Sequence, residues 1–114
     1  MDVALKESTL FLFTFYVPVD FVEEVKSAVF EAGAGKLGNY DCCCWMTLGQ
    51  GQFKPLENSS PCLGTKDQIT LVDEYKVEMI CCEEIAADVA VAFKKAHPYE
   101  EPAFYFTKVI SQDS

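Results

Sequence analysis

The residues with the clearest potential for chemistry lie in one short run, KKAHPYEEPAFYF, at 94–106. It contains the chain's only histidine, His97, followed closely by Tyr99, Glu100 and Glu101. Imidazole and carboxylate groups at this spacing could ligate a divalent metal ion. One histidine without a nucleophile or further ligands is too little for catalysis, so we expect no catalytic residue. The run also suits a corner in which His97 ends a helix, a proline stops it and a strand follows, and we favour this interpretation.

The six cysteines provide a second candidate site. If the second and third strands are antiparallel neighbours, a cysteine triplet on one lies near a cysteine pair on the other, and such a cluster could bind copper(I) or zinc or act in redox chemistry. The residues concerned are Cys42, Cys43, Cys44, Cys81 and Cys82. Successive residues of a strand face opposite ways, however, and no C-x-x-C spacing occurs. We therefore favour cysteines that pack as small hydrophobic residues, and we expect no cofactor.

A third candidate is the segment 49–64, which is rich in glycine, proline and serine and is predicted to be a long loop. Its opening GQGQF has the glycines of a phosphate-binding loop, but it lacks the GK[ST] motif and a following helix. Loops on rigid scaffolds often carry binding residues. We expect contacts with a ligand or partner at the start of this loop, at Gly49, Gln50, Gly51, Gln52, Phe53 and Lys54.

Composition narrows the range of partners and locations. Nine basic residues against eighteen acidic ones give a formal net charge of -9, which would repel the phosphates of nucleic acid. The N-terminus lacks the pattern of a signal peptide, and no apolar run approaches the roughly 20 residues of a membrane-spanning helix. We therefore expect a cytoplasmic protein with reduced cysteines that binds neither nucleic acid nor membranes.

The pattern of apolar residues predicts a single domain over residues 1–114 with a flexible tail at 111–114. Two helices are indicated by apolar residues at helical spacing, and the positions Val22, Val25, Val29 and Ala32 are matched in the second half by Ala86, Val89, Phe93 and Ala96. Four strands are indicated at 10–17, 40–48, 69–81 and 102–110. This doubled β-α-β unit predicts an α+β ferredoxin-like βαββαβ sandwich, with antiparallel sheet order 4-1-3-2 and both helices on one face.

The first strand, LFLFTFYV, is apolar on both sides. Because the helices can cover only one face of the sheet, the other face would expose apolar side chains, and such patches usually mark a protein interface. We expect a homo-oligomer whose interface includes Leu10, Phe11, Leu12, Phe13 and Phe15.

Four motifs, GAGKLGNYDCCCW, GQGQFKP, PCLG and AHPYEEPAF, together resemble the inserted domain of the Nif-three-like proteins, the YqfO type also described as GTP cyclohydrolase type-1-like. The resemblance spans about residues 10–110. That inserted domain is similar to the PII signalling and CutA divalent-ion-tolerance proteins, so the resemblance implies their version of the ferredoxin-like fold and favours a trimer over a dimer. The family's two-metal enzymatic body needs several histidines, which this chain does not have. The chain thus resembles the accessory domain alone.

Residues and resemblance together favour a non-enzymatic, self-associating regulatory or binding module of the PII/CutA type. Its contact region would be the long loop between the second and third strands. The alternative is a protein that handles divalent metal or copper(I), in the manner suggested by CutA. It would use the cysteine cluster or His97 with Glu100 and Glu101. A protein partner, including a separate Nif-three-like protein, is compatible with either hypothesis.

Overall fold

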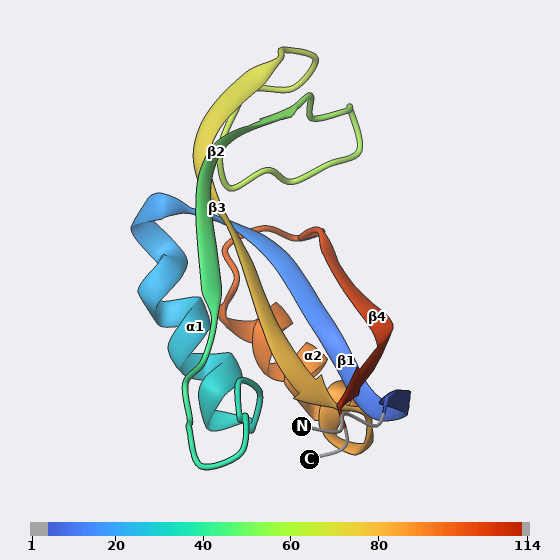
Figure 1. Cartoon of the computed structure of the whole chain (residues 1–114). Helices are drawn as coiled ribbons and strands as arrows, with labels where there is room; N and C mark the ends of the chain where they lie inside the picture. Colours follow the sequence, from blue (N-terminus) through green and yellow to red (C-terminus); the bar gives the residue numbers. More distant parts are fainter. Residues whose placement is uncertain (1–4, 113–114) are drawn as a thin grey trace.

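A computed structural model describes residues 5–112, with side chains described for residues 9–110. Strands and helices follow one another in the predicted order, and each helix is entered through a short 3-10 turn (Figure 1). Their bounds are β1 Leu5–Pro18, α1 Val22–Glu31, β2 Trp45–Phe53, β3 Thr70–Cys82, α2 Ala86–Ala96 and β4 Phe104–Gln112.

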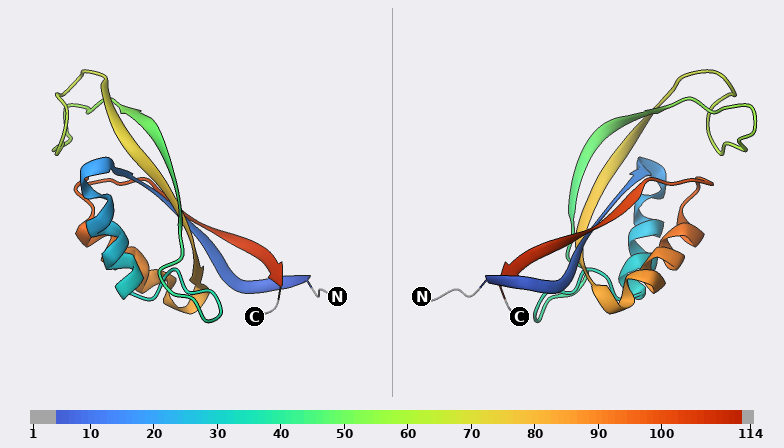
Figure 2. Two further views of the ribbon diagram at one scale, coloured as in Figure 1. Left: turned by 60° about the vertical axis from the view of Figure 1, so that its left-hand side comes forward. Right: turned by 90° about the vertical axis from the view of Figure 1, so that its right-hand side faces the viewer.

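The four strands form one antiparallel sheet in the order β2-β3-β1-β4, which is the predicted order 4-1-3-2 read in reverse. Both helices lie on one face of this sheet (Figure 2). The α+β ferredoxin-like sandwich is therefore confirmed. The β2–β3 hairpin extends beyond the helices as an arm, and the described molecule is accordingly elongated, with extents of 55 × 23 × 22 Å.

The internal repeat is also confirmed, because both halves start their helix in the same way. The 3-10 turn Val19–Phe21 leads into Val22–Glu31, and the 3-10 turn Glu83–Ile85 leads into Ala86–Ala96. Each helix buries its apolar stripe against the sheet, through Val22, Val25 and Val29 in α1 and Val89 and Phe93 in α2. The helical periodicity thus located both helices correctly.

The core is centred on Phe93, whose side chain has no exposed surface. Its ring lies 5.6 Å from that of Phe13 and 5.0 Å from that of Phe15, both on β1, and 5.1 Å from that of Phe104 on β4. Phe13 also stacks on Phe106, with ring centroids 4.5 Å apart. Tilted and edge-on aromatic pairs of this kind add to the free energy gained from burying their large apolar surface. This cluster joins α2 to the middle of the sheet.

The predicted position of the second strand is wrong by several residues. Residues 40–44 remain irregular, and β2 begins only at Trp45. Cys42 adopts a positive φ of 56°, its backbone N–H is held by the Asp41 carboxylate, and Cys43 donates its N–H to the carbonyl of Gly35. A residue with positive φ does not fit a strand, so the chain turns at Cys42. The two hydrogen bonds hold this turn in place. The strand instead continues through the glycine-rich segment to Phe53, and the connection to β3 is residues 54–69.

The predicted interface mixes two faces of β1. Phe13 and Phe15 are completely buried beneath the helices and belong to the core of a single chain, so the prediction that they form the interface is wrong. Phe11 points to the same side, where its ring contacts Phe106 at 5.9 Å and is half-buried. Leu10 and Leu12 alternate with these residues and lie on the face without helices. Only these two of the five predicted residues belong to that open face.

The two ends of the described chain add two facts. Ser111 and Gln112, where a flexible tail was expected to begin, pair with β1 as part of β4, whereas residues 113–114 lie outside the described part. Within residues 5–112, neither helix has the length and apolar character required to cross a membrane.

Replacing Phe93 by alanine should strongly destabilise the fold. Loss of the ring leaves a cavity between α2 and the sheet, and the free energy of unfolding should fall by about 3–5 kcal/mol. The matched control is Val91→Ala, because Val91 lies on the same helix but is 54% exposed, and its replacement should change stability by less than about 0.5 kcal/mol. Chemical denaturation at one fixed protein concentration measures both, and equal losses would contradict the assigned core.

Candidate functional site

The corner after α2 is held by His97, which is 6% exposed. Its backbone N–H donates to the carbonyl of Phe93, and its own backbone is extended, as expected for a residue before a proline. The backbone N–H of Tyr99 donates to Nδ1 at 3.1 Å. Nδ1 is therefore the acceptor, which places the proton on Nε2, and Nε2 donates to the carbonyl of Tyr16 at 2.7 Å. Burial lowers the pKa of His97, so the neutral ring is favoured.

Because both ring nitrogens of His97 make hydrogen bonds inside the chain, this residue joins the corner to the end of β1. A metal ion would have to displace one of these bonds. Glu100 is likewise engaged, because one of its carboxylate oxygens accepts the backbone N–H of Ser60 at 2.8 Å. That bond fixes the 54–69 connection against the corner.

Tyr99 and Glu74 form a polar pair beside the arm. The Tyr99 hydroxyl donates to Oε2 of Glu74 at 3.1 Å. Burial raises the pKa of Glu74, although the hydrogen bond from Tyr99 works in the other direction. Burial, together with the neighbouring Glu74 carboxylate, also raises the pKa of Tyr99 well above its usual range. A carboxyl group in a poorly hydrated position is a common feature of binding sites.

Gly51 makes room for this carboxylate. Gly51 lies on β2 opposite Val72, next to the position of Glu74 on β3, and a Cβ at Gly51 would collide with the Glu74 carboxylate. Gly49, two residues earlier, has open space where its Cβ would be. The two glycines of GQGQF therefore differ in their surroundings, and the absence of a side chain at Gly51 allows the Glu74 carboxylate to lie across the arm.

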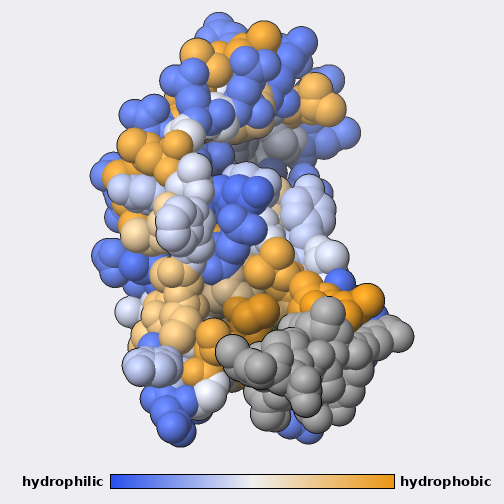
Figure 3. All heavy atoms as spheres, viewed as in Figure 1, coloured by the Kyte–Doolittle hydropathy of each residue, from blue (hydrophilic) through white to orange (hydrophobic). Residues whose placement is uncertain are grey.

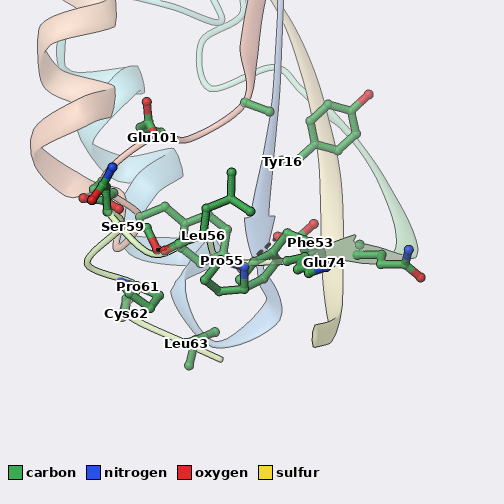
Figure 4. Close-up of a pocket in the computed structure, with 17 residues that line it drawn as sticks. Tyr16, Phe53, Pro55, Leu56, Ser59, Pro61, Cys62, Leu63, Glu74 and Glu101 are labelled. Carbon is green, nitrogen blue, oxygen red and sulfur yellow. Dashed lines mark hydrogen bonds between the residues drawn. The ribbon is translucent and has the colours of Figure 1, made fainter. Parts of the chain in front are cut away.

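A cleft of about 860 Å³ lies between the arm, the 54–69 connection and the corner (Figure 4). Phe53, Pro55, Leu56 and Leu63 supply apolar walls, and the Phe53 ring is 5.6 Å from that of Tyr99. This volume is within the range of small-molecule sites.

The predicted contact residues are only partly in a loop. Gly49 to Phe53 belong to β2, and Lys54 is the first residue after it. The residues among them that line the cleft are Gly51, Gln52, Phe53 and Lys54, whereas Gly49 and Gln50 do not. The corner motif supplies Tyr99, Glu100 and Glu101 to the same cleft, with His97 behind them.

Two important lining residues, Tyr16 and Glu74, were not predicted. Both lie near the point where the pairing of β1 with β3 ends, on strands whose apolar pattern is otherwise typical of a sheet, so neither stands out in the sequence. The one available signal is that Tyr16 and Glu74, on neighbouring strands, lie toward the same end of the sheet as the corner motif.

The cysteines do not form the candidate metal-binding cluster, and the favoured interpretation, cysteines packed as small hydrophobic residues, is confirmed for Cys81 but wrong for Cys42 and Cys44. Cys81 is buried in the core, where desolvation raises the pKa of its thiol to about 11, whereas Cys42 and Cys44 are exposed in the turn before β2. Burial also raises the pKa of Cys44, although nearby Lys26 partly offsets this effect. Residues 5–112 include all six cysteines, and they contain no group of three or more histidine, cysteine, aspartate or glutamate side chains placed to hold a metal ion.

Gly51→Ala should be more harmful than Gly49→Ala. The new methyl group must push the Glu74 carboxylate aside and break its bond with Tyr99, which should cost about 1 kcal/mol of unfolding free energy. Gly49→Ala meets open space and should stay within about 0.5 kcal/mol of the wild type. Denaturant unfolding of the two variants gives the comparison, and equal stabilities would contradict the position of Glu74.

His97 should make stability fall as pH falls. The unfolded chain binds a proton at the ordinary histidine pKa of about 6.5, whereas the folded chain resists protonation because the pKa of His97 is lowered. The stability due to neutral His97 is therefore present at higher pH and is lost below about pH 6.5.

The test is the unfolding free energy of wild type and His97→Gln between about pH 7.5 and 5.5, above the main range of carboxylate titration. Since the chain has one histidine, the unfolding free energy of the variant should depend much less on pH than that of the wild type. An unchanged pH dependence in the variant would show that His97 is not buried in its neutral form.

The chain has relatives among known proteins. No family model matches the chain. It is 47% identical over 89 residues to a GTP cyclohydrolase 1 type 2 homolog of Mycobacterium leprae, a match that covers 78% of this chain and 23% of the relative. The corresponding protein of Bacillus subtilis is 38% identical over 89 residues, covering 78% of this chain and 24% of the relative. The chain thus spans about a quarter of the length of these curated relatives.

Solved structures agree with this result. A Bacillus cereus protein related to NIF3 superimposes with a TM-score of 0.77 at 33% identity, covering 90% of this chain and 26% of that protein. The divalent cation tolerance protein CutA of Archaeoglobus fulgidus has a TM-score of 0.63 at 15% identity, and the match covers 88% of this chain and 83% of CutA. The likeness to CutA shows the fold alone. The chain is therefore homologous to one segment of the NIF3-related GTP cyclohydrolase 1 type 2 homologs, and this segment has the CutA-like fold.

Proposed function

We propose that this chain is a non-enzymatic module of the PII/CutA type that associates with copies of itself through the open face of its sheet. We further propose that it contacts a ligand or a protein partner through the cleft beside the arm. The observation that carries the proposal is the exposure of large aromatic side chains on the open face. Trp45 is 69% exposed and Tyr105 is 59% exposed.

These two residues belong to one row across the sheet. The strand register aligns Trp45 with Glu78, Glu78 with Thr14, and Thr14 with Tyr105. Since paired residues of antiparallel strands point to the same side, the whole row faces away from the helices. Figure 3, which views this face, shows hydrophobic residues gathered over the lower part of the sheet.

A shallow hollow beside this row strengthens the case for a second copy. It has a volume of about 480 Å³ and is lined by Leu12, Trp45 and Ile80 among others. Because each chain carries a net charge of -9, copies repel one another at long range, so the favourable contacts would come from the uncharged rings of the row and not from Glu78, which lies between them. The resemblance of the four sequence motifs to the PII/CutA-like inserted domain favours a trimer over a dimer.

The proposed module carries out no reaction of its own. Both nitrogens of its single histidine are used to hold the corner, which leaves no free imidazole for acid–base chemistry at the cleft. The relatives' name describes proteins about four times as long as the matched segment, so we assign their named activity to no residue of this chain. All six cysteines are free thiols, which suits the reducing cytoplasm where we propose that it resides.

Native mass spectrometry under reducing conditions tests the self-association. Wild-type protein should give a complex of three chains, and the double variant Trp45→Glu/Tyr105→Glu should give single chains, because two added carboxylates would be desolvated at the interface. Both side chains are exposed in the single chain, so the variant should keep its fold, which circular dichroism checks.

The matched control is Val91→Glu, which adds a carboxylate on the exposed side of α2, opposite the open face. It should leave the trimer intact. Single chains for the wild type would overturn the proposed self-association, and an intact trimer in the double variant would overturn its location.

A further inference from the structure

The charged side chains that line the cleft are mostly acidic. Glu74, Glu100 and Glu101 contribute carboxylates, and Lys54 contributes an ammonium group. Within a chain of net charge -9, this balance creates a negative potential that attracts cations and repels phosphates and carboxylates. The glycines that suggested a phosphate-binding loop lie in β2, and Gly51 contacts the carboxylate of Glu74, so they favour no anion.

The walls of the cleft are also suited to a cation with an apolar body. The rings of Phe53 and Tyr99 lie 5.6 Å apart at 59° to each other, and Pro55 and Leu56 continue the apolar surface. In Figure 4, Pro55 and Leu56 lie between Glu74 on one side and Glu101 on the other. Aromatic rings attract organic ammonium groups through their negative faces, and hydrocarbon groups are stabilised by leaving water.

Glu74 is the best placed carboxylate to meet such a group. It is half-buried, its Oε2 accepts the Tyr99 hydroxyl, and its carboxylate lies across Gly51. A carboxylate can accept several hydrogen bonds, so the bond from Tyr99 orients the group and leaves further acceptor capacity for an N–H donor. Glu100 is already engaged by Ser60, and Glu101 is exposed at the other side of the cleft.

We propose that the cleft binds a small organic ammonium ion, with its charge paired to Glu74 and its apolar body against Phe53, Tyr99 and Leu56. This inference rests on the proposed role of the cleft as the contact region and names the class of ligand. The same charges disfavour nucleotides and other phosphate esters.

The desolvation of Glu74 supports this assignment. Burial raises the pKa of this carboxyl group, because the charged form lacks full hydration. A bound ammonium group would supply the missing counter-charge and lower that pKa again. Affinity for the amine should therefore increase as pH rises through the pKa of Glu74.

The test compares phenylbutylamine with phenylbutyrate, which have similar apolar bodies and opposite charges. Titration of the full chain is followed by calorimetry and by amide NMR shifts. The amine should bind and shift residues of the cleft, Phe53 and Tyr99 among them, whereas the carboxylate should not bind. Equal binding of both probes, or no shift in the cleft, would overturn the inference.

Glu74→Gln keeps the shape of the side chain and removes its charge, so it should weaken binding of the amine by about tenfold. Glu31→Gln is the matched control, because Glu31 is exposed at the end of α1, away from the cleft. This variant should bind the amine with the affinity of the wild type. Unchanged affinity in Glu74→Gln would also overturn the inference. If Glu74→Gln folds poorly, Glu101→Gln provides a second test. The expected loss of affinity for the amine is smaller, because Glu101 is exposed.

Native mass spectrometry of the same samples separates this inference from the proposed self-association. A trimer that ignores the amine would overturn the ligand class alone. Single chains that bind the amine, with loss in Glu74→Gln, would support the ligand class and overturn the self-association.

Discussion

The packing of α2 on the sheet through Phe93 is the interaction on which the rest of the structure depends. One ring contacts both β1 and β4, so it determines how far the helix lies from the sheet and which turn of the helix lies over the central strands. Aromatic rings are large and rigid, and a dense core leaves few alternative arrangements for them. Small changes at this point would therefore alter the position of the corner and of β4.

The cleft is built outward from this core through a series of ring contacts. Phe93 touches His97 at 5.2 Å, His97 touches Tyr99 at 4.9 Å, and Tyr99 touches Phe53 at 5.6 Å. The hydrogen bond from His97 Nε2 to the carbonyl of Tyr16 holds the middle of this series to β1. Because the buried core positions the corner and the corner positions Tyr99, the cleft has a rigid wall although it lies beside a long connection. Glu74 then owes its orientation to Tyr99 on one side and to Gly51 on the other.

The two solvent-facing features have different physical characters. The open face presents the exposed rings of Trp45 and Tyr105 in a row that also contains Glu78 and Thr14, whereas the cleft combines aromatic walls with desolvated and exposed carboxylates. An apolar face gains free energy by excluding water over a broad area, as in contacts between copies of a protein. A concave site with a few oriented charges instead selects a ligand by charge and shape. The same small fold can therefore support assembly and binding in separate places.

Much of the fold could be predicted from local patterns. The helices at Val22 and Ala86 follow from apolar residues at helical spacing, and the doubled unit implies the order of the strands. The start of β2 could not be predicted, because the glycine-rich GQGQF segment is typical of a loop and the cysteine triplet at 42–44 suits a strand, whereas the structure places GQGQF in β2 and the triplet before it. Cys42 turns the chain with a positive φ, and Gly51 leaves room in β2 for the Glu74 side chain of the neighbouring strand. The contact of Gly51 with Glu74 joins residues distant in sequence, so the local pattern around GQGQF does not reveal it.

The sequence by itself thus determined the class of fold, the two helices, the corner at His97 and the acidic character of the chain, because periodicity, turn chemistry and charge are local or additive properties. Only the tertiary structure decided which face of β1 enters the core, which cysteines are exposed, and that Tyr16, Glu74 and Tyr99 line one cleft. These outcomes depend on strand register and twist, which place residues from separate segments side by side and which no single segment encodes.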